Sequence, residues 1–103
     1  MIRRLDPKDP GEIRTLTFDF GPDLKAETIS GTPTASIAMY TGTDAQSANV
    51  LYGSPVVVGQ RVTVRVRNGV LDAEYLIKVL VTTNLGNIYA IGAVLPVKNV
   101  GTF

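Results

Sequence analysis

The sequence contains no histidine, no cysteine and no tryptophan. Without histidine, the chain lacks the commonest general base and metal ligand, and a Ser-His-Asp or Cys-His catalytic arrangement cannot exist. Without cysteine, disulfides and thiolate metal sites are excluded. The 9 carboxylates are scattered, and the 10 glycines are dispersed among turns rather than gathered in a phosphate-binding loop. We therefore expect no enzyme activity, no metal and no cofactor.

Charge is also scarce. Asp, Glu, Lys and Arg make up 18% of the residues, where about 25% is usual, and this low share is a first indication that another chain covers part of the surface. The net charge of +1 argues against a nucleic-acid partner. No window approaches the roughly 20 apolar residues of a membrane span, and the start Met1-Ile2-Arg3-Arg4 lacks the apolar stretch of a secretory signal. We expect synthesis in the cytoplasm and no membrane partner.

The sequence is rich in segments where apolar and polar residues alternate with a period of two, which is typical of half-buried strands. Gly, Pro, Asn and Asp separate these segments, as turns require. About seven short strands in 103 residues predict one all-β domain, an antiparallel β-sandwich. The expected strands are 13–20, 29–40, 50–52, 56–58, 61–67, 75–83 and 88–97, and Asp44–Val50 could form one turn of helix.

The two ends of the chain read differently from this middle part. Residues 1–11 form an expected extended N-terminal arm, because Pro7 and Pro10 fix φ and keep the preceding residues extended. The arm is either a solvated end or a segment that docks on a neighbour. Asp6 and Asp9 of the arm, with Glu12 just after it, could form an oxygen-only calcium site, but a solvated, proline-stiffened end is the favoured interpretation. Residues 12–98 form the sandwich, and residues 99–103 a C-terminal tail.

The last two expected strands are apolar on both faces. With one face of each strand in the core, the outward face should be polar in a one-sided sandwich. A chain of this length has too little material for a third layer, so we expect a partner or a second copy to cover the outward face. A bulge at Gly92 that switches the alternation is the alternative. The expected interface residues are Leu76, Leu80, Ile88, Ala90 and Val94.

A basic stripe occupies one face of the expected strand 61–67. Arg61, Arg65 and Arg67 alternate there with valines, and they could bind an anionic partner. The alternative is a solvated face whose arginines form cross-strand ion pairs. Together with Tyr40 and Tyr52, the stripe could also serve a carbohydrate- or surface-binding module, although sugar sites need more exposed aromatics than a chain with 7% aromatic residues offers.

Three parts of the sequence resemble small immunoglobulin-like (Ig-like) structural proteins encoded by tailed bacteriophages and prophages among their head and tail genes. They are the DP-rich start Asp6-Pro7-Lys8-Asp9-Pro10, the pair Asp19-Phe20 at the end of the first strand, and a late hairpin that runs from Tyr75 through Thr83 with Gly86. Members of this group usually carry Trp where Phe20 stands, and a polar outward face where Ile88, Ala90 and Val94 stand.

The resemblance implies an Ig-like β-sandwich without enzymatic activity. It implies a virion component made in the host cytoplasm, such as a decoration, neck or fibre-associated module. The expected partners are other virion proteins or further copies of the chain, as a homo-oligomer. Repetition on a virion would make modest single contacts sufficient.

Overall fold

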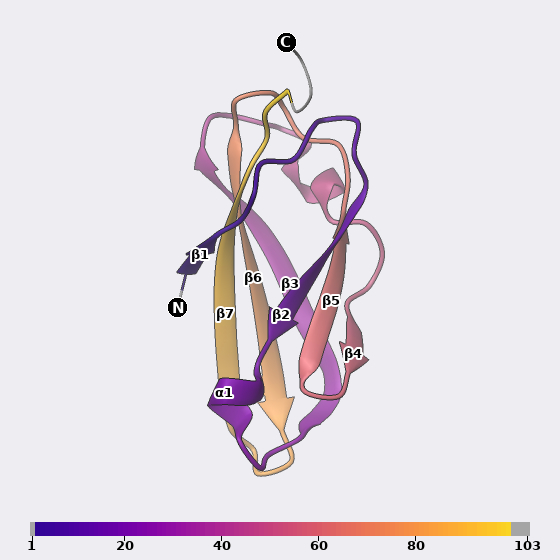
Figure 1. Cartoon of the computed structure of the whole chain (residues 1–103), viewed down its shortest axis with the longest axis vertical. Helices are drawn as coiled ribbons and strands as arrows, with labels where there is room; N and C mark the ends of the chain where they lie inside the picture. Colours follow the sequence, from indigo (N-terminus) through magenta and orange to yellow (C-terminus); the bar gives the residue numbers. More distant parts are fainter. Residues whose placement is uncertain (1, 100–103) are drawn as a thin grey trace.

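Two β-sheets pack face to face in the computed structural model, which describes residues 2–99 (Figure 1). One sheet has four strands in the order β1 (Ile2–Arg4), β7 (Ile88–Pro96), β6 (Glu74–Thr83) and β3 (Ile29–Thr41). The other has three strands in the order β2 (Arg14–Asp19), β5 (Arg61–Val66) and β4 (Val56–Val58). Among the described residues, the helical elements are α1 (Gly21–Leu24) and the 3₁₀ helix η1 (Ser47–Val50).

All neighbouring strands are antiparallel except β1 and β7, which run parallel. The neighbours β3-β6-β7 and β2-β5-β4 match strands C-F-G and B-E-D of an immunoglobulin sandwich. The expected all-β sandwich of about seven strands is therefore confirmed.

Tyr75 anchors the start of β6 to the loop before it. Its side chain is fully buried, and its hydroxyl accepts a hydrogen bond from the backbone N–H of Val70 at 2.7 Å. The same hydroxyl donates to Asp44 Oδ2 at 2.7 Å. A tyrosine that bonds back to the backbone a few residues upstream, at the corner before a strand, has the arrangement called a tyrosine corner.

The core lies between the sheets and takes alternate residues from each long strand. β5 shows the pattern most simply, because Val62, Val64 and Val66 are buried while Arg61 and Arg65 are exposed. Leu24 of α1 is also buried and closes one end of the sandwich (Figure 1).

The N-terminal segment lies along its own domain. The N–H of Leu5 donates to the carbonyl of Val94 at 2.8 Å, and the N–H of Lys8 donates to that of Pro96 at 2.9 Å. Lys8 is fully buried, with its ammonium donating to the carbonyls of Asp9 at 2.7 Å and Asn68 at 2.8 Å. Desolvation lowers the pKa of Lys8. Met1 of the expected arm and residues 100–103 of the expected tail lie outside the described residues.

The expected strand at 50–52 is wrong. Val50 ends the 3₁₀ helix η1, and only Leu51 forms a bridge, to Val66. Asp44 explains the difference, because its carboxylate accepts the N–H of Gln46 at 2.8 Å and its carbonyl accepts that of Ser47 at 3.2 Å. These local bonds begin the helical turn that the sequence allowed here.

Candidate interaction surfaces

The outer face of the four-stranded sheet is the side of that sheet turned away from the core. Its central rows, read across β7, β6 and β3, are Val94, Leu76 and Ala38, then Gly92, Lys78 and Ser36, then Ala90, Leu80 and Thr34. Lys78 is the one charged residue in these rows. Most of the remaining side chains are small, so the face is flat and nearly neutral.

All five expected interface residues point to this outer face, but they differ in exposure. Ile88 is 64% exposed and Ala90 is also exposed, while Leu76 and Leu80 are half-buried. Val94 is 3% exposed, so it offers a partner little area. No bulge at Gly92 switches the alternation, since β6 and β7 stay in register from Glu74–Pro96 to Thr82–Ile88.

An ion pair explains why Val94 is buried on an outer face. The Arg4 guanidinium of β1 pairs with the Glu74 carboxylate of β6, and Thr41 of β3 donates to the same carboxylate at 3.0 Å. Arg4 is the register partner of Val94, and Glu74 is that of Pro96. Because β7 runs between β1 and β6, the ion pair crosses β7 at these two buried residues. Sequence reasoning missed this cover, because Arg4 lay in the expected arm.

The arginine stripe lies on the outer face of the three-stranded sheet and divides into two parts. Arg61 faces its register partner Asp19, with 3.8 Å between Arg61 Nε and Asp19 Oδ2. The guanidinium carbons of Arg65 and Arg67 lie 4.7 and 4.3 Å from the centre of the Tyr52 ring. Within residues 2–99, no carboxylate pairs with Arg65 or Arg67.

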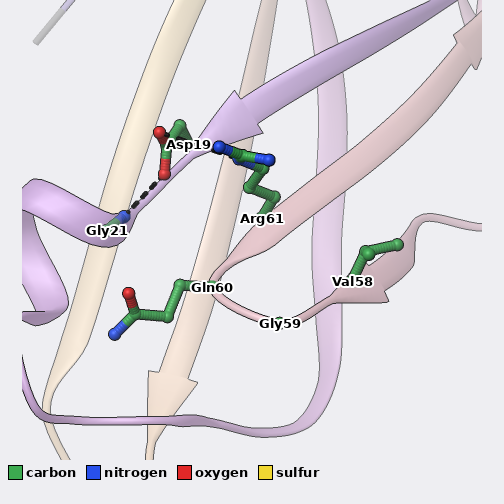
Figure 2. A pocket seen from close by; sticks show the side chains of 6 residues that line it. All are labelled: Asp19, Gly21, Val58, Gly59, Gln60 and Arg61. Carbon is green, nitrogen blue, oxygen red and sulfur yellow. Dashed lines mark hydrogen bonds and ion pairs between the residues drawn. The ribbon is translucent and has the colours of Figure 1, made fainter.

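A hollow of ≈ 350 Å³ lies beside the Arg61–Asp19 pair, lined by Asp19, Gly21, Val58, Gly59, Gln60 and Arg61 (Figure 2). Asp19 and the side-chain nitrogen of Gln60 are already engaged. Asp19 Oδ1 accepts the N–H of Gly21 at 2.9 Å, and Gln60 Nε2 donates to the carbonyls of Lys25 and Glu27 at 2.7 and 2.9 Å. These two groups are therefore not free to bind a ligand in the hollow.

The structure does not bring the two tyrosines of the carbohydrate-binding alternative together. Tyr40 is 53% exposed on β3 of the four-stranded sheet. Tyr52 is half-buried beside β5 of the other sheet, where its N–H donates to the carbonyl of Arg65 at 2.9 Å. Its ring already contacts two guanidinium groups, so a sugar would have to displace them to stack there.

Sequence reasoning missed the exposure of β4. Val56, Val57 and Val58 are all exposed, at 55%, 37% and 59%. The available signal was a run of three β-branched residues with no polar alternation, which is unusual for a strand with one solvated face.

Across residues 2–99, no group of three or more Asp and Glu side chains could hold a metal ion. In the same part of the chain, no helix has the length and apolar character needed to cross a membrane.

Comparison with known protein families matches residues 8–96 to the family described as podophage GP4 fiber-tail adaptor protein gp77. The match runs from the buried Lys8 to the last residue of β7, and so includes all of both sheets except β1. No curated protein and no solved structure matches the chain. The resemblance to small structural proteins of tailed phages is confirmed. The chain thus belongs to the podophage GP4 fiber-tail adaptor protein gp77 family, and it is a structural module of a phage tail.

Proposed function

We propose that this chain joins a tail fibre to the phage tail by protein–protein contact alone, as a non-catalytic virion component. Membership of the fiber-tail adaptor family supports this role. The outer face of the four-stranded sheet carries the contact, with Leu80, Ala90 and Ile88 as its accessible apolar residues and Leu76 beside them.

The flatness and neutrality of this face are the observation that carries the proposal. Apolar area removed from water contributes roughly 25 cal/mol per Å², whereas an unpaired charge at the centre of an interface is costly. Lys78 is the one charged residue in the central rows, and the small residues Ser36, Ala38 and Gly92 keep the surface low enough for a partner to approach the backbone. The face therefore suits a broad, shallow contact.

The Arg4–Glu74–Thr41 contacts link strands β1, β6 and β3 at the end of this face. A surface that is ordered before binding loses less conformational freedom when the partner arrives. Several copies on one particle would raise the overall affinity further. A modest single contact is then enough for a stable joint.

A double substitution tests the proposal. Leu80→Lys with Ala90→Lys places two charges on the face, and Thr15→Lys with Thr17→Lys adds the same charge on the exposed outer side of β2. Each purified variant is added to particles assembled without the chain, and fibre attachment is scored by electron microscopy. We expect attachment to be lost for the first variant and kept for the second. Normal attachment by a folded Leu80→Lys/Ala90→Lys protein would refute the proposed contact.

A further inference from the structure

Four strands form the edges of the two sheets, and three of them carry features that discourage pairing with another chain. β1 contains Arg3 and Arg4, and β2 begins with Arg14 and ends with Asp19. β3 has a register shift between Ser30 and Thr34, in a stretch that includes Gly31 at φ +73 and Pro33. Charges, prolines and irregular backbone are the usual protection of edge strands.

β4 itself contains no charge, no proline and no register shift, although Pro55 directly precedes it. It pairs with β5 only, its register is regular, and its three valines are exposed. The flanking segment from Gly53 to Gln60 contains no charged residue. An uncharged, apolar, regular edge is a template for the addition of another strand.

We propose that β4 is a self-association site, at which the β4 strands of two copies pair antiparallel about a two-fold axis through Val57. The two three-stranded sheets would then continue into one sheet of six strands. The charge pattern selects a second β4 as the occupant. Pairing β4 with β1 or β2 of another copy would set Arg3, Arg14 or Asp19 against valines, whereas β4 against β4 buries no charge.

The backbone of β4 suits this axis. The two-residue loop Gly59-Gln60 joins β4 to β5, so Val58 and Arg61 close the hairpin as a hydrogen-bonded pair. Along an antiparallel strand, the backbone N–H and C=O groups of successive residues point alternately toward one neighbouring strand and the other. Because those of Val58 point toward β5, those of Val57 point away from it, toward the open edge. Two copies of Val57 can exchange a pair of hydrogen bonds across the axis.

The side chains fit the same register. Val56 and Val58 pair with the outward residues Thr63 and Arg61, and Val57 pairs with the buried Val62. Val56 of one copy would lie opposite Val58 of the other. Each Arg61 would then share a row with Thr63 of the second copy. The two Arg61 residues lie on the two β5 strands, which are three strand spacings apart, or about 14 Å at roughly 4.8 Å per spacing. Like charges therefore do not meet.

Sedimentation velocity over a concentration series up to the millimolar range tests the site, because a contact of three residues a side predicts weak association. We expect the apparent mass to rise from 11.0 kDa toward twice that value. Val56→Lys with Val58→Lys should weaken association at least about tenfold, since like charges then face each other across the axis. Circular dichroism shows whether this variant folds, and both substituted side chains point away from the core.

A charge-reversed variant fixes the register. Val56→Lys with Val58→Glu places Lys opposite Glu of the second copy twice, so its association should equal or exceed that of the original chain. Val70→Lys with Leu85→Lys, at exposed apolar residues away from β4, should leave association unchanged. A chain that stays monomeric throughout, or a Lys/Lys variant that associates normally, overturns the proposal. The Leu80→Lys/Ala90→Lys protein keeps β4 intact, so failure of this site and failure of the fibre contact are distinguishable.

Discussion

Two buried polar side chains anchor the loop between β5 and β6 at one end of the sandwich. Lys8 donates to the carbonyl of Asn68, and Tyr75 accepts the N–H of Val70. Gly69 lies between these contacts at φ +105, and a Cβ there would lie 2.8 Å from Val97 Cγ2. Within residues 2–99, no buried side-chain nitrogen or oxygen lacks a hydrogen-bond partner. Burial of these groups is therefore compensated at each atom.

Replacing Tyr75 by Phe tests the tyrosine corner. The change keeps the buried ring but removes the hydroxyl, which leaves the N–H of Val70 and the carboxylate of Asp44 without this partner. An unpaired buried polar group costs about 1–3 kcal/mol, and we expect a loss of stability of that size in urea unfolding. Tyr40→Phe is the matched control, because Tyr40 is 53% exposed and no hydrogen bond of its hydroxyl is seen in the described part of the chain. Equal effects of the two changes would contradict the assignment.

The sequence predicted the inward position of Tyr75 from the alternation along β6, but not the partners of its hydroxyl. Asp44 is 31 residues away, on a loop whose path depends on the packed sheets. The burial of Lys8 had no local signal either. A lysine between two Asp-Pro pairs is expected to be solvated. It is buried because the carbonyls of Asp9 and Pro10, which follow it in the chain, and that of the distant Asn68 converge on its ammonium.

At the scale of elements, Glu27 ties the link between α1 and β3 to the β6–β7 hairpin at the opposite end of the sandwich. Its carboxylate accepts hydrogen bonds from Thr83 Oγ1 at 2.7 Å, from Asn87 Nδ2 at 3.0 Å and from Tyr89 Oη at 3.0 Å. The bonds from Thr83 and Asn87 hold the pKa of Glu27 below its usual value. In return, the bond to Glu27 raises the pKa of Tyr89.

This pKa shift predicts how acid affects the contact between the two elements. A depressed folded-state pKa means that the Glu27 carboxylate stabilises the fold above the ordinary glutamate pKa of about 4.3, and that this contribution is lost as pH falls through the lower folded value. Glu27→Gln should therefore lower the urea midpoint at neutral pH, and the difference from the original chain should shrink with acidification. A difference that stays constant from about pH 7 to about pH 3 would show that the shift is absent.

Period-two alternation placed the long strands within one or two residues of their observed ends, because each has one buried face. β2, β5, β6 and β7 all follow this rule. The strand β1 was missed, since Ile2–Arg4 is short and its pairing partner lies about 90 residues later. The open edge of β4 was also beyond local sequence reasoning, because the spatial neighbours of a strand depend on the topology of the whole sheet.

At the scale of the whole molecule, the two outer faces differ in charge. The three-stranded sheet presents Arg65 and Arg67 without carboxylate partners among residues 2–99, while the four-stranded sheet presents Lys78 alone in its central rows. The net charge of +1 conceals this difference. Salt weakens a contact made by the charged face more than a contact made by the nearly neutral face. The dependence of binding on ionic strength therefore shows which face is used.

We expect fibre attachment through the nearly neutral face to change less than about twofold between low and high ionic strength, because screening weakens only charged contacts. Attachment of the original chain to particles that lack it, measured over a series of sodium chloride concentrations, checks this. A steep loss of attachment at high salt would assign the contact to Arg65 and Arg67 instead, and Arg65→Gln with Arg67→Gln would then abolish it.

The parallel pairing at the start of the chain has a mechanical consequence for a component of a tail. β1 and β7 run in the same direction, and bonds from Leu5 and Lys8 continue this alignment to the end of β7 (Figure 1). A force that pulls the first strand and the last strand apart along their common axis loads all of these bonds at once, in shear, rather than opening them one at a time. The bonds of the buried Lys8 ammonium add to this alignment, so we expect the paired strands to resist tension applied along their common axis.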